Sequence, residues 1–130
     1  MTGYNGTEAR KTVRATVTPS SKDLYWAAGF IEGEGSFVAL STTARVSVEQ
    51  VNQEPVLRLL TLFGGSLRRY QKYHNPTLYN KQRHPTWTWT ATGSRARGII
   101  MTLYSLMSAK RQGQMYRAVA RGPHRESEKI

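Results

Sequence analysis

The chain has 130 residues, 38% of them hydrophobic, and carries 19 Lys and Arg against 8 Asp and Glu, a formal net charge of +11 at pH 7. One domain with one hydrophobic core fits this length, and the basic charge predicts a nucleic acid, an anionic membrane surface or an acidic protein as partner. The apolar content excludes a wholly disordered chain, the absence of cysteine excludes disulfides and cysteine-based zinc sites, and no run reaches the ~20 apolar residues of a membrane span.

The two ends of the chain are polar. Residues 1–19 are basic without helical periodicity, and we expect a flexible basic arm there, although "TVRATV" also fits a short strand. They lack the apolar stretch of a secretory signal, so we expect an intracellular protein, in the cytoplasm of a prokaryote or in an organelle. Residues 20–121 are predicted to form the folded domain, and residues 122–130 a disordered tail.

The domain is predicted to begin with a helix over 21–32. Ser20 and Asp23 have the spacing of a capping box, and Gly33 is a natural helix terminator. The remaining elements alternate like strands or carry helical periodicity, and follow in the order strand 36–43, strand 45–51, helix 53–65 with Gly64 or Gly65 as its stop, strand 66–73, strand 86–92, and helical residues from 94 with a break near 108. This order predicts an α+β fold with helices packed on one face of an antiparallel sheet.

The first predicted helix contains an unusual pair of glycines. Gly29 and Gly33 lie four residues apart, and glycine is unfavourable inside a helix by about 1 kcal/mol relative to alanine. Small residues at this spacing allow two helix backbones to approach closely. The two glycines therefore indicate one of two arrangements. Either two helices make a tight contact there, or this part of the helix packs beneath another element of the same chain.

The end of this helix is also acidic. Glu32 and Glu34 flank Gly33, where the partial negative charge of a helix C-terminus disfavours acids. A divalent cation would reverse this preference, because carboxylates and carbonyls are hard oxygen ligands. In a basic protein such a site favours phosphodiester hydrolysis, and the alternative is a pair of solvated surface acids. The G-x-G spacing does not indicate a dinucleotide site, since that motif needs a strand before it and a helix after it.

The stretch "WAAGFIEGEGSF" resembles the LAGLIDADG motif of homing endonucleases, in the variant form G-F-I-[DE]-G-E-G-S-F. The resemblance continues in "VSVEQVNQEPVLRLLTLFGGSL", "WTWTATG" and "LYSLMSAKRQGQM" and covers about residues 24–117 in the family's order. It implies an αββαββα fold with a saddle-shaped sheet backed by helices. The chain has one copy of the motif, which implies a homodimer. The implied interface residues, on the motif helix, are Trp26, Ala28, Gly29, Glu32 and Gly33.

The resemblance also implies the active-site residues. Glu34 would hold Mg²⁺, with Mn²⁺ or Ca²⁺ as structural substitutes, and the Gly33 carbonyl would be an additional ligand, while Glu32 would brace the helix end. Gln50, with Gln53 as the alternative, would position the attacking water. Lys110 would stabilise charge on the phosphate.

Strand alternation predicts which side chains face DNA. If Phe37, Val46, Val48, Leu67 and the tryptophans of 86–92 point toward the helices, the opposite face carries short polar and basic side chains. The predicted DNA-binding residues are Ser36, Val38, Leu40, Thr42, Arg45, Ser47, Arg68, Tyr70, Lys72 and Thr88, with Lys81 and Arg83 in a basic loop that grips phosphates. An HNH-type site in that loop is disfavoured, since the loop contains Pro76 and Pro85 and no helical stripe.

The function that this resemblance implies is site-specific cleavage of double-stranded DNA at a long pseudo-palindromic target, as in intron or intein mobility. The expected partners are DNA and a second copy of the chain, with no membrane and no small-molecule substrate. Two alternatives remain. One is a catalytically silent relative that acts as a transcriptional regulator or intron maturase, and the other is a ribosome-associated or RNA-binding domain.

Overall fold

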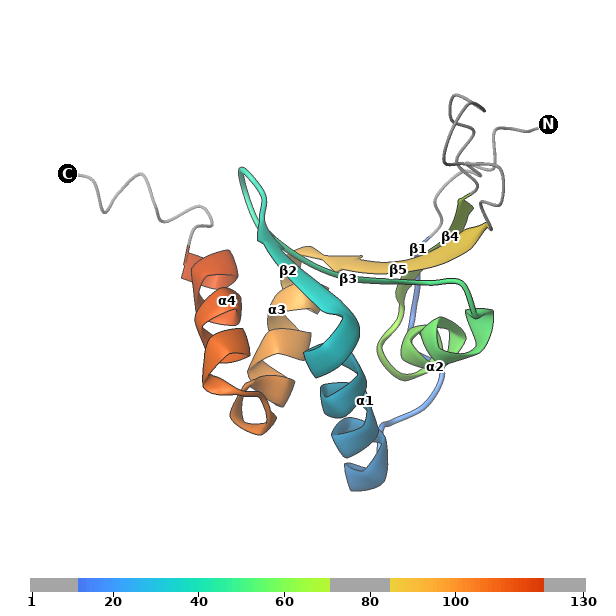
Figure 1. The fold of residues 1–130 in the computed structure, drawn as a ribbon, viewed down its shortest axis with the longest axis horizontal. Helices are drawn as coiled ribbons and strands as arrows, with labels where there is room; N and C mark the ends of the chain where they lie inside the picture. The colour runs from blue at the N-terminus through green and yellow to red at the C-terminus, as the bar shows by residue number, and fades with distance from the viewer. Residues whose placement is uncertain (1–11, 71–84, 121–130) are drawn as a thin grey trace, which may run out of the picture.

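The computed structural model describes residues 12–70 and 85–120 of the chain. In these residues five strands form one antiparallel sheet, and the helices lie together on one side of it (Figure 1). The elements are β1 (Thr12–Val13), α1 (Ser21–Glu34), β2 (Gly35–Ala39), β3 (Ala44–Gln50), α2 (Gln53–Phe63), β4 (Gly65–Tyr70), β5 (Thr86–Thr92), α3 (Gly93–Leu103), a 3-10 turn (Tyr104–Leu106) and α4 (Ala109–Ala120). The predicted α+β class, with an antiparallel sheet backed by helices, is confirmed.

The sheet has the strand order β1–β4–β5–β3–β2 and separates a packed face from an open one. Val46 and Val48 of β3 and Trp89 of β5 point toward the helices and are almost completely buried. Val48 pairs with Trp89, and Leu67 of β4 pairs with Trp89 from the other side. These three side chains therefore point to the same face of the sheet, toward the helices. The intervening residues therefore form the open face, as predicted from the alternation.

Helix α1 begins as predicted but ends later. Ser20 and Asp23 form the complete capping box. The helix continues through Gly33 to Glu34, and the Gly35 N–H closes it by donating to the Ile31 carbonyl. A Cβ at position 35 would lie 2.6 Å from Ile31 Cγ2, whereas one at position 33 would have no neighbour within 4 Å. Gly33 is therefore not the terminator, and Glu34 is the last residue of the helix.

Glycines at the α2–β4 turn dock the amino-terminal segment. Gly64 is the C-cap of α2, as predicted, with a φ of 74°. A Cβ there would lie 2.7 Å from the Val13 carbonyl oxygen, so only glycine fits this conformation beside β1. Thr12 pairs with Ser66, and the short strand that "TVRATV" predicted as an alternative lies at the edge of the sheet. Residues 1–11 and 121–130 lie outside the described residues.

Two other boundaries define the surroundings of the site. The helical residues from 93 onward break before Ser108, as predicted, and α4 packs beside β2 and β3. Strand β2 ends at Ala39, so Leu40 and Thr42 lie in the turn to β3, where the Leu40 N–H donates to the Thr43 carbonyl at 2.6 Å. The prediction that Leu40 and Thr42 extend the strand is therefore wrong. Among the described residues, no helix has the length and apolar character needed to cross a membrane.

Candidate active site and nucleic-acid interface

The end of α1 and the end of β3 bring two predicted catalytic side chains together. Glu34 is the last residue of α1, and its side chain is exposed. Gln50 is the last residue of β3 and has the inward parity of Val46 and Val48. Its Nε2 donates to Glu34 Oε1 at 3.1 Å. Gln53, the alternative to Gln50, is the first residue of α2, so the hydrogen bond favours Gln50 as the partner of Glu34.

Glu32 has a different environment from Glu34. The Ser108 N–H donates to Glu32 Oε1 at 3.0 Å, and Arg111 Nε donates to the Glu32 backbone carbonyl at 2.9 Å. The carboxylate thus lies at the amino end of α4, where the helix dipole favours an acid. Hydrogen bonds from Ser108, assisted by the charges of Arg111 and Lys110, lower the pKa of Glu32. Glu32 braces α1 against α4 within one chain, as expected for the helix end, and its place in a dimer interface stays a prediction.

This contact predicts a pH dependence of stability. Because the folded-state pKa of Glu32 is depressed, its contribution is present above the usual value of 4.5 and is lost as the pH falls through the folded-state value. Asp23, whose pKa the Ser20 hydrogen bonds lower, adds a loss in the same direction. We expect Glu32→Gln to lower the free energy of urea unfolding at pH 7 and to flatten its decline below pH 4.5. An unchanged acid profile would contradict the bracing role.

Besides Lys110, a second cation lies at the end of α1 and makes a hydrogen bond to it. Lys110 is exposed in the first turn of α4, and among the described residues no ion pair joins it to Glu34. Arg111 was missed, although it is bonded to the Glu32 carbonyl and its Nη1 donates to Gln114 Oε1 at 2.7 Å. The adjacent pair "KR" indicated a basic residue here, but only the three-dimensional packing distinguishes the two positions.

The oxygen donors at the end of α1 suit a magnesium ion whose coordination shell is completed by other ligands. In the described part of the chain, no three His, Cys, Asp or Glu side chains group as metal ligands, and the candidate donors are the Glu34 carboxylate and the Gly33 carbonyl. Carbonyls in the last turn of a helix lack intrahelical partners. Magnesium retains several waters and is commonly held by one or two carboxylates together with substrate phosphates. The donor set therefore fits Mg²⁺ bound jointly by protein and phosphate.

The open face carries most of the predicted DNA-binding residues in register. In one row across the sheet, Glu49 of β3 and Arg68 of β4 both pair with Thr88 of β5. Neighbouring rows contain Ser47, Thr90 and Ser66, and then Arg45 and Thr92. The predicted residues that share this face are Ser36, Val38, Arg45, Ser47, Arg68, Tyr70 and Thr88. Lys72, Lys81 and Arg83 lie outside the described residues.

Two charged side chains of the open face are held in distinctive ways. Thr86 Oγ1 donates to Glu49 Oε2 at 2.6 Å, which fixes the one carboxylate that the described residues present on this face. Sequence reasoning placed Glu49 outward but did not include it among the contacts. Arg45 Nε is buried without a hydrogen-bond partner among the described residues. The face thus combines a fixed acceptor with guanidinium and hydroxyl donors, the groups that read base edges.

The glycine pair of α1 lies on a surface. Gly29 and Gly33 are exposed, and a Cβ added at either would have no neighbour within 4 Å. The alternative in which they fit beneath another element is therefore excluded for the described residues. Tyr25, four residues before Gly29, is 64% exposed and extends the same side of the helix.

Two other predicted interface residues are used inside the chain. Ala28 is 3% exposed and belongs to the core. Trp26 stacks on Phe30 with ring centroids 5.3 Å apart, and the Arg58 guanidinium lies 4.0 Å from its ring. The interface prediction is therefore wrong for Ala28, and Trp26 packs mainly within its own chain.

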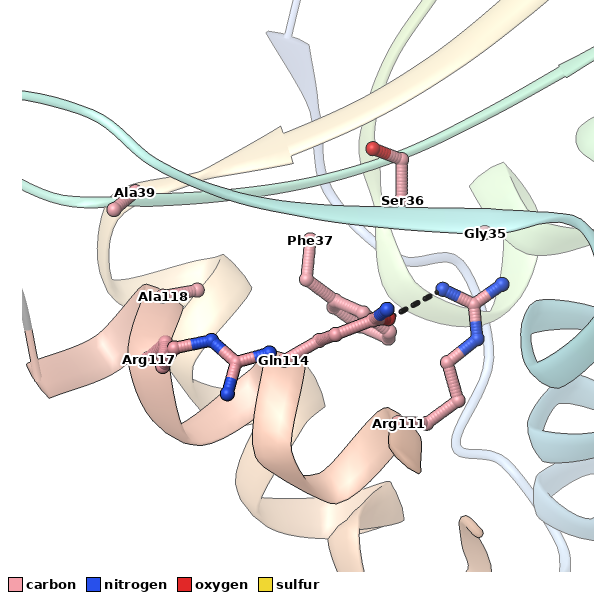
Figure 2. A pocket seen from close by; sticks show the side chains of 8 residues that line it. All are labelled: Gly35, Ser36, Phe37, Ala39, Arg111, Gln114, Arg117 and Ala118. Carbon is pink, nitrogen blue, oxygen red and sulfur yellow. Dashed lines mark hydrogen bonds between the residues drawn. The ribbon is translucent and has the colours of Figure 1, made fainter. Parts of the chain in front are cut away.

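A groove lies between α4 and β2 and is named here the basic groove. It has a volume of about 350 Å³ and is lined by Gly35, Ser36, Phe37, Ala39, Arg111, Gln114, Arg117 and Ala118. Figure 2 shows Arg111, Gln114 and Arg117 on the α4 side, while Ser36 and Phe37 point to opposite sides of β2. Since Gly35 follows Glu34 directly, the groove begins next to the candidate active site.

No model of a protein family matches this chain, and a search of curated proteins found no significant match.

Proposed function

We propose that the chain is a magnesium-dependent, site-specific DNA endonuclease with the LAGLIDADG fold that acts as a homodimer. The observation that carries this proposal is the hydrogen bond between Gln50 Nε2 and Glu34 Oε1 at the end of α1. It joins a carboxylate to an amide at the border of a sheet face that carries Arg45 and Arg68. The net charge of +11 supports a polyanionic substrate.

In the proposed mechanism each side chain has a limited task. Bound magnesium would polarise the scissile phosphate and lower the pKa of a bound water. The Glu34 carboxylate would hold that ion, and Gln50 orients the carboxylate through the observed bond and offers its amide oxygen to the attacking water. Glu32 keeps α4 docked against α1. Arg111, fixed by the Glu32 carbonyl, adds positive charge near the phosphate.

A cleavage selection tests the function directly. The full-length chain is incubated with a randomised duplex library in Mg²⁺, and cut and bound fractions are sequenced separately. We expect both fractions to share one pseudo-palindromic sequence, cut in both strands. Enrichment of a bound sequence without cutting in Mg²⁺ or Mn²⁺ would favour the regulator or maturase alternative, and absence of any enriched sequence would contradict site-specific binding.

Arg68 provides a test of base reading on the open face. An arginine can contact guanine O6 and N7 with two hydrogen bonds, worth about 1–3 kcal/mol of discrimination. We expect Arg68→Gln to relax the selected sequence at one symmetric pair of positions and to leave other positions unchanged. Selection from the same library with the variant measures this change.

The neighbouring residue is the matched control. Arg69 lies on the same strand but points to the packed side, where its guanidinium lies 5.9 Å from the Trp87 ring. Arg69→Gln should affect stability and leave the selected sequence unchanged. A uniform loss of affinity across all sequences in Arg68→Gln would reassign Arg68 to the phosphate backbone.

A further inference from the structure

We propose that the basic groove between α4 and β2 binds a DNA backbone phosphate. This phosphate would neighbour the scissile phosphate at Glu34 on the same strand, so the groove would contribute affinity without reading sequence. This inference rests on the proposed function, because it takes the bound polyanion to be DNA. It adds a contact outside the open face, on the free edge of the sheet, where β2 is the terminal strand.

The lining of the basic groove is cationic and rich in hydrogen-bond donors. Arg111 donates from Nε to the Glu32 carbonyl and from Nη1 to Gln114 Oε1, which holds its guanidinium in one orientation. A guanidinium has five N–H donors, so most of those on Arg111 remain for a ligand. The Phe37 ring lies 5.6 Å from the same guanidinium and supports it from the β2 side. A cation fixed in this way is well suited to a phosphate oxygen.

Arg117 supplies a second positive charge from the same side of α4. Its side chain is exposed, and none of the hydrogen bonds or ion pairs found in the described residues involves it. Positions 111, 114 and 117 are three apart, so they form one stripe along the helix that faces β2 (Figure 2).

Continuity with the proposed active site identifies the ligand. The groove is lined by Gly35, the residue after Glu34, and by Ser36, which belongs to the open face. The Ser36 side chain points away from α4 (Figure 2), so a DNA strand that reaches Glu34 from the open face would pass around the edge of β2 to meet the groove. Among the residues that the structure describes, no carboxylate lines the groove, and its two arginines favour an anion as occupant.

Gln114→Glu is the sharpest test. A glutamate keeps an oxygen that accepts from Arg111 Nη1, so the fold is preserved, but it puts negative charge in the groove. The full-length chain and a duplex of the selected sequence are measured at several salt concentrations. We expect the slope of log affinity against log salt to fall by about 1 and the affinity at 0.1 M salt to fall about tenfold, uniformly across sequences. Arg117→Gln should give the same change in slope.

Thr102→Glu is the matched control, because it makes the same charge change at an exposed position of α3 that does not line the groove. It should change the slope much less than Gln114→Glu. If the wild type binds duplex DNA but Gln114→Glu and Arg117→Gln keep its slope, the groove inference is wrong while the proposed function stands. If the wild type prefers RNA of the same sequence, or binds neither, both fail.

Discussion

Glu34→Gln is expected to abolish strand cleavage and to leave affinity for the target duplex largely unchanged. The substitution removes the charge that would hold magnesium but retains an oxygen that can accept from Gln50 Nε2, so the local geometry survives. Loss of metal-assisted charge stabilisation worth several kcal/mol corresponds to a fall in cleavage rate of about a thousandfold or more. Single-turnover cleavage in Mg²⁺ and a binding titration in Ca²⁺ measure the two quantities separately.

Glu32→Gln is the control for this experiment, since it changes the same kind of side chain two residues earlier. Glu32 contacts Ser108 at the start of α4, so its loss should reduce stability more than cleavage at neutral pH. If Glu34→Gln cuts at the wild-type rate, Glu34 is not the metal ligand. Equal losses of cleavage in both variants would mean that the roles of the two acids have been assigned wrongly.

The features that could be predicted from the sequence depend on short-range periodicity. Alternation in "RVSVEQV" places Val46 and Val48 on one side and Arg45 and Ser47 on the other, and the structure has this arrangement. The same alternation predicts that Gln50 points to the side of Val46 and Val48, and in the structure its side chain makes a hydrogen bond to Glu34. The capping box of Ser20 is equally local, because both of its hydrogen bonds join residues three apart.

The features that could not be predicted depend on contacts between distant residues. Glu32 meets Ser108 across 76 positions of the chain, and no local pattern shows that this contact explains an acid at a helix end. Lys110 and Arg111 are chemically alike and adjacent, so only the docking of α4 decides which one makes a hydrogen bond to α1. Gly35 rather than Gly33 is the C-cap, and its close approach to Ile31, which leaves no room for a Cβ, is a contact that the sequence does not show.

The residues around Gly29 show that sequence-based prediction is also limited within a single helix. Their small size predicted a close contact but not which side of the helix makes it. The structure assigns Ala28 to the core and leaves Gly29 and Gly33 exposed. The two exposed glycines carry a cost in helix propensity that no packing within the described residues offsets. A partner helix seated on this surface would provide the missing reason.

Gly29→Leu therefore separates assembly from folding. Leucine is favoured over glycine in an exposed helix by up to about 0.8 kcal/mol, so the isolated chain should be at least as stable as the wild type. A bulky side chain at position 29 should nevertheless keep two α1 helices apart and abolish both the dimer and cleavage of the second strand. Sedimentation velocity, free and on target DNA, together with urea unfolding, measures the two effects.

Gly98→Leu is the matched control, because Gly98 is also an exposed helical glycine with no neighbour within 4 Å of an added Cβ, but on α3. It should gain similar helix stability and remain a dimer. In the proposed dimer the two Glu34 carboxylates lie near the symmetry axis, each at one scissile phosphate, and half-sites lie about 10 base pairs apart. A wild type that sediments as a monomer both free and on its target would overturn this assembly, since one chain presents a single Glu34 to two strands.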